Sequence, residues 1–211
     1  MAIFSLNHRP IGRRTHKPGR AGSHIRYIAR PGASPEIISN GISKDWRKAK
    51  KWFDEQERNS RKNGRVADRI MIALPIELDN SQRITLVKDY LKDLTNDQIP
   101  YFVAIHQEGK DRNNPHAHIL LRDKSLINGR RLIKTSEKGS TMILREKWTE
   151  SANKALREAN LSEEIQITHK SYKDQGIEKE PSKHLGLNQK KWRYKMRDEE
   201  DAKREILRAY I

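Results

Sequence analysis

The sequence contains no cysteine, few aromatic residues and no long apolar run. Without cysteine the chain has neither disulfides nor thiolate metal sites, so any metal must be held by His, Asp, Glu or backbone oxygen. Hydrophobic residues make up 34% and aromatic residues 6% of the 211 residues, which predicts a modest core with charged helices around it. No stretch approaches the roughly 20 apolar residues of a membrane span. The N-terminus also lacks the apolar region of a signal peptide. We therefore expect a cytoplasmic protein without membrane insertion.

Acidic residues are also scarce relative to basic ones. The chain has 28 Asp and Glu against 44 Lys and Arg, which gives a net charge of +16. Such an excess favours a polyanionic partner, either nucleic acid or an anionic membrane surface. A generic basic protein, for example a ribosome-associated one, is the alternative. Charge alone favours nucleic acid of some kind.

Apolar periodicity and turn residues predict an α+β fold with a central, largely antiparallel sheet and helices packed on one face of it. A basic loop rich in Gly, Pro and Arg is expected at 9–22, and Ser23 is the expected N-cap of the helix that follows it. The main domain should span 1–187, with 188–211 forming a charged, peripheral C-terminal helix. We expect strands at 3–6, 66–74, 100–107, 115–121 and 165–167, and helices at 24–30, 44–63, 81–94 and 141–159.

Three histidines are expected to converge on the predicted hairpin. His116 and His118 are separated by one residue on a predicted strand, so both side chains point to the same face. His106 ends the preceding strand and should lie almost opposite His116 if the turn is centred near Asp111. Three imidazoles on a rigid hairpin would half fill a coordination sphere and leave positions open for water or substrate. A structural or surface histidine cluster is the alternative interpretation.

Several motifs together resemble the MobA/MobL-type (MobQ-type) plasmid mobilization relaxases, which belong to the HUH endonuclease superfamily. Each motif is weak alone, but together they occur in the expected order over most of residues 1–187. The resemblance therefore implies that residues 1–187 form the relaxase domain. They are HIRYIARPG at 24–32, ALPIEL at 73–78, NPHAH at 114–118 with His106 before it, KWTESANKALREA at 147–159 and HKSYKDQGIEKEPSKHLG at 169–186.

The resemblance implies an activity and its residues. Such enzymes bind a DNA hairpin and adjoining single strand at an origin of transfer, nick one strand and stay linked to its 5′ end, and they rejoin the strand after transfer. The metal ligands would be His106, His116 and His118, with Mg²⁺ or Mn²⁺ as the metal, and the nucleophile would be Tyr27. Accessory mobilization proteins and a coupling protein are the implied protein partners.

Some assignments remain open at the level of the residues. Related enzymes carry an acid in the strand before ALP, where this sequence has Met71, and Asp68 and Glu108 are candidates to replace it as the assisting carboxylate. Without the resemblance, Tyr90 and Tyr101 would rival Tyr27 as nucleophile.

Basic and aromatic residues are the candidates for DNA contact. Single strands are usually held by stacking on aromatic rings, and Trp46, Trp52 and Trp148 are candidates for this, although core packing is the better interpretation of them. The basic candidates are Arg9, Arg13, Arg14, Lys17 and Arg20 on a flexible arm, and His24 and Arg30 on the helix of Tyr27.

Three other functions compete with the relaxase interpretation. A rolling-circle replication initiator or transposase of the same superfamily would use the same chemistry at a different DNA site. A non-catalytic nucleic-acid-binding protein with structural histidines would retain its function after Tyr27→Phe. A metal-dependent nuclease that uses water would leave a free 5′ phosphate and no covalent adduct.

Overall fold

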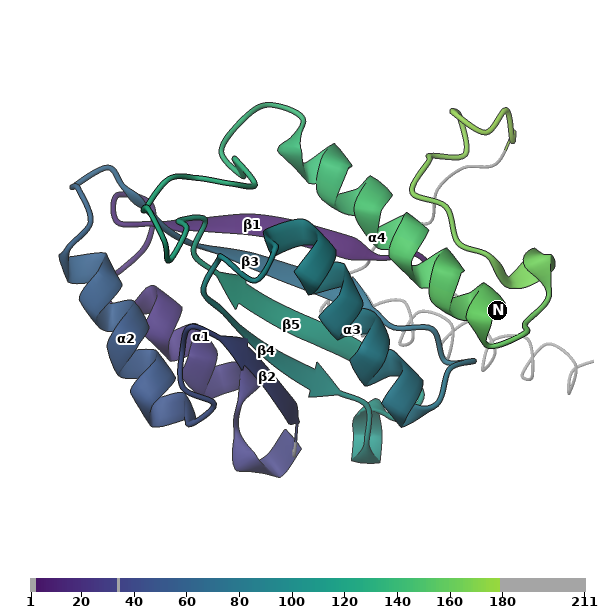
Figure 1. Cartoon of the computed structure of the whole chain (residues 1–211), viewed down its shortest axis with the longest axis horizontal. Coiled ribbons are helices and arrows are strands. Elements are labelled where there is room, and N and C mark those ends of the chain that lie inside the picture. The colour runs from purple at the N-terminus through teal and green to yellow at the C-terminus, as the bar shows by residue number, and fades with distance from the viewer. Residues whose placement is uncertain (1–2, 34, 179–211) are drawn as a thin grey trace, which may run out of the picture. The chain divides into compact units, whose positions relative to one another are not determined.

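The computed structural model of the chain describes residues 3–33 and 35–178 (Figure 1). The chain divides into two compact units, Met1–His169 and Lys170–Ile211. In the described part of the second unit, the Ser171 hydroxyl donates to Asp174 Oδ2 at 2.6 Å. The helix expected at 188–211 and the domain boundary expected after residue 187 lie outside the described residues.

The first unit is built on one antiparallel sheet, in which the order of the strands in space differs from their order along the chain. Its spatial order is β1-β3-β5-β4-β2, and every neighbouring pair is antiparallel. The predicted α+β class with an antiparallel central sheet is therefore confirmed. The strands are β1 (Leu6–Gly12), β2 (Glu36–Asn40), β3 (Arg65–Ala73), β4 (Tyr101–His106) and β5 (His116–Leu121).

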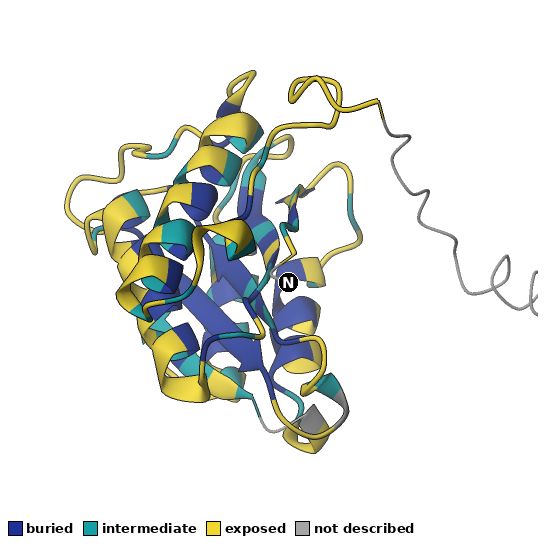
Figure 2. Cartoon of the chain, turned by 90° about the vertical axis from the view of Figure 1, so that its right-hand side faces the viewer, coloured by how far each residue is buried: buried dark blue, intermediate teal, exposed yellow. Residues whose placement is uncertain are grey.

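Helices cover both faces of this sheet, and not one face as the sequence suggested. Two separate cores, one on each side, account for the difference, because the strands carry apolar residues at both alternating sets of positions. Figure 2 shows the buried strands between helices whose outer surfaces are exposed. In the described part of the chain, no helix is both long and apolar enough to cross a bilayer. Helices α1 (Arg20–Ile28) and α2 (Trp46–Arg58) contribute to one core, and α3 (Asn80–Thr95) and α4 (Ser140–Glu158) to the other.

The edges of the sheet differ most from the prediction. The first strand was expected at 3–6, but β1 begins only at Leu6 and runs to Gly12, so the loop expected at 9–22 is shorter. Pro10 is tolerated in β1 because an edge strand has a neighbour on one side only. The opposite edge strand, β2, was not predicted. The segment 165–167 forms no strand, and a 3-10 helix at Glu163–Ile165 occupies its beginning.

The helix that carries Tyr27 also begins earlier than predicted. Its N-cap is Gly19, at φ 76°, and no side chain caps it. Ser23 therefore lies inside the helix. A left-handed backbone at Gly19 costs little because glycine has no Cβ, so the Gly-rich stretch starts the helix three residues before the expected serine.

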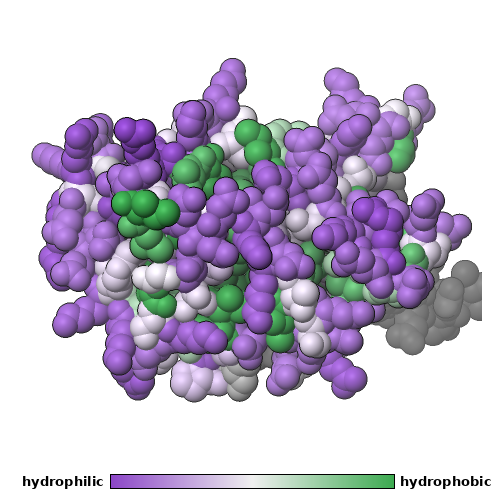
Figure 3. Space-filling model, viewed as in Figure 1, coloured by the Kyte–Doolittle hydropathy of each residue, from purple (hydrophilic) through white to green (hydrophobic). Residues whose placement is uncertain are grey.

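The outer surface is strongly polar. Figure 3 shows hydrophilic residues over most of the face that carries α3 and α4, with small, separate apolar areas between them. This matches the charged composition of the chain, in which 34% of residues are Asp, Glu, Lys or Arg.

Candidate active site

Three histidines meet at one end of the β4–β5 hairpin. His106 and His116 are direct cross-strand partners, and His118 follows on the same face of β5. The ring centroids are 5.2 Å apart for His106–His116, 5.3 Å for His106–His118 and 5.1 Å for His116–His118. The hairpin thus brings the three predicted side chains together, and their role as metal ligands stays a prediction.

Backbone carbonyls orient two of these rings. His106 Nε2 donates to the Ile28 carbonyl at 2.8 Å, because a carbonyl only accepts. His116 Nδ1 donates in the same way to the carbonyl of Asn114, also at 2.8 Å. In the neutral form of each ring this hydrogen bond fixes the tautomer and leaves the other nitrogen as an acceptor, which is the arrangement found around metal-binding histidines.

Burial favours the neutral form of two of the three rings, His106 and His118. It lowers the pKa of His118 to about 3, with a further contribution from positive charge on His116 and His106. Burial also lowers the pKa of His106, although its hydrogen bond to Ile28 acts in the opposite direction. Since a metal competes with protons for imidazole nitrogen, these two side chains are available to a metal at neutral pH.

The rings have the spacing of a shared metal site but their nitrogens have not converged. Imidazoles bound to one tetrahedral metal through nitrogens at about 2.1 Å have ring centres about 5 Å apart, which matches the cluster. Among the described residues, however, no three His, Asp or Glu side chains are already arranged to hold a metal ion. The rings must therefore rotate for their free nitrogens to meet at one point.

The carboxylate beside the triad is one that the sequence did not single out. Asp111 Oδ2 lies 3.6 Å from His106 Nδ1, the nitrogen that the Ile28 hydrogen bond leaves free. Asp111 belongs to the turn between the two histidine-bearing strands. Its place in that turn was the available signal, but the polar stretch around it resembled an ordinary loop.

Neither of the two expected carboxylates joins the triad. Asp68 lies on the other face of β3, where it contacts His8 at 2.9 Å, accepts from the Thr135 hydroxyl at 2.7 Å and pairs with Arg65. Because strand side chains alternate, the face that holds Asp68 is the one opposite His118 and its partner Met71. Glu108 is exposed and directly precedes a short 3-10 helix, Gly109–Asp111, in the turn between β4 and β5.

Close packing of α1 on α2 fixes the position of Tyr27. Ile25 and Ile28 are fully buried on one side of α1, whereas Tyr27 is 58% exposed. A Cβ added to Gly22 would overlap the side chains of Asp54 and Lys50 on α2, so a larger residue there would force these side chains to move. The exposed tyrosine is thus carried by a helix that packs closely against its neighbour.

His24 links Tyr27 to the histidine triad. Its ring centroid is 6.4 Å from that of Tyr27 and 6.0 Å from that of His118. On the other side, the Arg30 guanidinium lies 4.7 Å from the centroid of the Tyr27 ring and donates to the Tyr27 carbonyl at 2.9 Å. His24 and Arg30 therefore both flank Tyr27, although α1 ends at Ile28 and Arg30 lies just beyond the helix on which it was expected.

The rival tyrosines are buried in the core. Tyr90 is 0% and Tyr101 5% exposed, and burial raises the pKa of both phenols. Among the tyrosines of Met1–His169, all within the described residues, only Tyr27 reaches solvent. Trp148 is also fully buried, and Trp46 and Trp52 pack against the core beneath α1 and α2.

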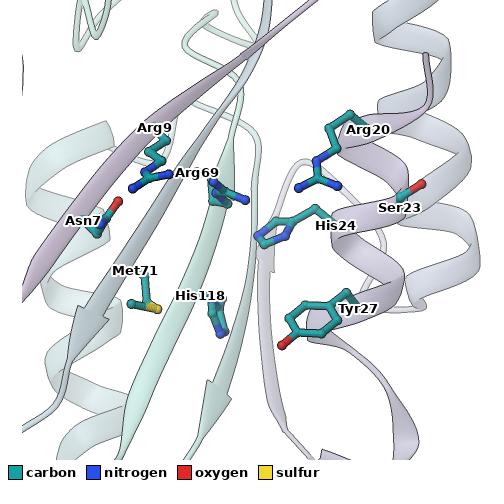
Figure 4. A pocket seen from close by; sticks show the side chains of 9 residues that line it. All are labelled: Asn7, Arg9, Arg20, Ser23, His24, Tyr27, Arg69, Met71 and His118. Atoms are coloured by element: carbon teal, nitrogen blue, oxygen red, sulfur yellow. The ribbon is translucent and has the colours of Figure 1, made fainter. Parts of the chain in front are cut away.

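The predicted basic arm is divided between a strand, a loop and a helix. Arg9 on β1 and Arg20 on α1 line a cavity of about 430 Å³ that also includes His24, Tyr27 and His118 (Figure 4). Arg13 donates instead to the Ser60 carbonyl at 2.5 Å, which attaches the loop to the end of α2. Arg14 and Lys17 are exposed in that loop.

Two solved structures have a similar fold. A solved structure described as "Molecular Basis of Vancomycin Resistance Transfer in Staphylococcus aureus" superposes with a TM-score of 0.59 at 20% identity, covering 81% of this chain and all of that one. The conjugative relaxase TrwC, in complex with oriT DNA and metal, superposes with a TM-score of 0.50 at 13% identity, covering 89% of this chain and 88% of that one.

The chain belongs to the MobA/MobL family, whose model matches residues 17–142 and 130–195. Mobilization protein A from Escherichia coli is 31% identical over 89% of this chain and 30% of its own length. The 43 kDa relaxation protein from Salmonella typhimurium is 30% identical over 59% of this chain and 35% of its own length. The chain thus spans about a third of the length of these curated relatives.

Proposed function

We propose that this chain is the nicking domain of a DNA relaxase, which cleaves one strand at an origin of transfer with Tyr27 as the nucleophile. One observation carries the proposal: the solvent-exposed tyrosine of the first unit lies beside a three-histidine cluster, with His24 between them. The relatives support it, since they include a mobilization protein and a relaxation protein, and the similar TrwC structure contains oriT DNA.

The reaction is a transesterification in which no water takes part. The Tyr27 oxygen attacks the scissile phosphorus, a phosphotyrosine bond to the 5′ end forms, and the bond to the 3′ oxygen breaks. The phenol gives its proton to solvent and the departing 3′ oxygen takes one from solvent, so the 3′ end leaves as a hydroxyl with no net release of protons. Because one phosphodiester replaces another, attack by a 3′ hydroxyl reverses the step and rejoins the strand.

Positive charge must assist this step, because a free phenol has a pKa near 10 and is a poor nucleophile at neutral pH. Arg30, over the Tyr27 ring, supplies one such charge. His106, His116 and His118 would hold a divalent metal, Mg²⁺ or Mn²⁺. When bound, such an ion polarises the phosphate and stabilises the charge of the transition state.

Asp111 is our candidate for the assisting carboxylate, in place of Asp68 and Glu108. It lies next to the free nitrogen of His106, so its charge would favour a cation held there. The physical partners we propose are the hairpin and adjoining single strand of the origin, accessory mobilization proteins and a coupling protein. We propose the cytoplasm as the location of the reaction, because the proposed substrate is DNA.

The test is a nicking assay with end-labelled single-stranded DNA from the replicon that carries the gene, incubated with Mn²⁺. The expected product is a labelled protein–DNA adduct that survives denaturation. Tyr27→Phe should abolish it and leave DNA binding largely intact, whereas Lys154→Gln, an exposed change on α4, should retain it. Free 5′ phosphate without an adduct would indicate a water-using nuclease. Cleavage confined to a replication origin would indicate an initiator instead.

A further inference from the structure

Three arginines face one another across the cavity beside Tyr27. Arg9 comes from β1, Arg69 from β3 and Arg20 from the first turn of α1, and all three line the cavity. Figure 4 shows the three guanidinium groups pointing into the space between the sheet and the helix, at the end opposite the Tyr27 hydroxyl. The sequence motifs did not single out Arg69.

No acid balances these charges at the cavity. Among the residues that the structure describes, none of those lining it is Asp or Glu. The arginines repel one another instead: the pKa of Arg69 is lowered by burial and then by the charges of Arg20 and Arg9. Like charges held together without a counter-charge destabilise the free protein, and an anion between them removes the repulsion.

His24 provides a second, independent sign of a ligand. Its residue is 8% exposed, its Nε2 has no hydrogen-bond partner among the described residues, and it lines the same cavity. A buried polar nitrogen without a partner costs free energy. In the neutral ring, Nε2 can carry the proton and donate to an oxygen that enters the cavity.

We propose that Arg9, Arg20 and Arg69, with His24, form a subsite for one DNA phosphate that neighbours the scissile phosphate on the same strand. The inference rests on the proposed function, because it takes the ligand to be the strand that Tyr27 attacks. One planar guanidinium group can donate two parallel hydrogen bonds to two oxygens of the same phosphate. The cavity also reaches Tyr27 and His118, so a phosphate held at its arginine end would position the next phosphate at the tyrosine.

The salt dependence of binding tests this directly. We would measure binding of a fluorescein-labelled 12-nucleotide oligothymidine by anisotropy in EDTA, over a range of NaCl concentrations. Each neutralised phosphate of a single strand adds about 0.7 to the slope of log K against log salt. Replacing Arg9, Arg20 and Arg69 together by Gln should lower the slope by about 0.7 and the affinity about fivefold at 0.1 M salt.

The other outcomes contradict the proposal. An unchanged slope means that the cavity binds no phosphate, and a fall of about 2 means that the arginines hold three separate phosphates. The matched control replaces Lys92, Lys154 and Arg157, exposed residues of α3 and α4, by Gln. It removes the same charge and should leave the slope unchanged. An equal fall in the control would show a general charge effect and overturn the subsite.

A second measurement places the phosphate in the strand and guards against misfolding of the triple variant. Single methylphosphonate linkages on either side of the cleaved bond should weaken binding of the wild type at one position only. Arg69→Gln alone should then lose its sensitivity to that linkage. Equal sensitivity in both proteins would overturn the inference. The oligothymidine test needs no cleavage, so it still reads the subsite if no Tyr27 adduct forms.

Discussion

Mild acid should destabilise the first unit through His24 and His118, which fold into environments that disfavour their charged forms. The pKa of His24 is lowered from 6.5 to about 4, mainly by burial and then by the positive charges of Arg69 and Arg20. Burial lowers that of His118 from 6.5 to about 3. Because the unfolded chain binds the proton more tightly than the folded one, this stability is complete above pH 6.5 and is lost as the pH falls toward the folded values.

The expected size follows from these values. At pH 5 an unfolded imidazole is mostly protonated while both folded rings stay neutral, so each histidine costs about 2 kcal/mol relative to pH 7.5. Together they should lower the free energy of unfolding by about 4 kcal/mol. The carboxyl groups titrate mainly below this range, since their ordinary pKa values are near 4.

Urea unfolding in EDTA at several pH values between 5 and 7.5 measures this loss. His24→Gln should remove about 2 kcal/mol of the pH-dependent loss, because it removes one of the histidines whose pKa folding lowers. Ser23→Ala, a change in the same helix and cavity, should keep all of it. A wild-type protein whose free energy of unfolding is the same at pH 5 and pH 7.5 would refute the assignment of these rings as buried and neutral.

Other predictions concern the carboxylates and the helix contact. Asp68→Asn should lower the free energy of unfolding by roughly 3 kcal/mol, because the charged partner of a buried ion pair is left uncompensated. The folded variant should still form the adduct. Loss of the adduct in a folded variant would contradict the position of Asp68 on the face of the sheet away from the histidines. Asp111→Asn should weaken Mn²⁺ binding, measured by calorimetry, by about tenfold or more, with nicking restored at saturating metal; unchanged Mn²⁺ affinity would remove Asp111 from the site. Gly22→Ala should cost about 1–3 kcal/mol in urea unfolding, since its Cβ would overlap the side chains of Asp54 and Lys50, and an unaltered midpoint would contradict a tight contact between α1 and α2.

Local patterns were enough to predict the centre of the fold. The apolar runs of β4 and β5 and the polar turn between them predicted the hairpin, and the pairing of His106 with His116 agrees with it. Helix α3 followed from its periodic apolar residues, with Asp79 and Gln82 forming a capping box at its start. These signals are contained within one or two adjacent elements.

The edges of the sheet and the cavity depended on contacts between distant segments. Strand β2 has only five residues, and its pairing with β4 cannot be read from its own sequence. Asp68 was expected near the histidines because it lies in the right strand, but its side chain points to the other face. Arg69, Arg9 and Arg20 line the same cavity from three different elements, β3, β1 and α1. No single sequence motif contains all three residues.

The central claim is that Tyr27 becomes covalently joined to DNA. The direct measurement is mass spectrometry of the protein after incubation with Mn²⁺ and its single-stranded origin DNA, followed by nuclease and protease digestion. The account predicts a nucleotide-bearing peptide that contains Tyr27, formed as well by Tyr101→Phe as by the wild type if that variant folds. A nucleotide on any other residue, or a cleaved strand with no modified peptide, would contradict it.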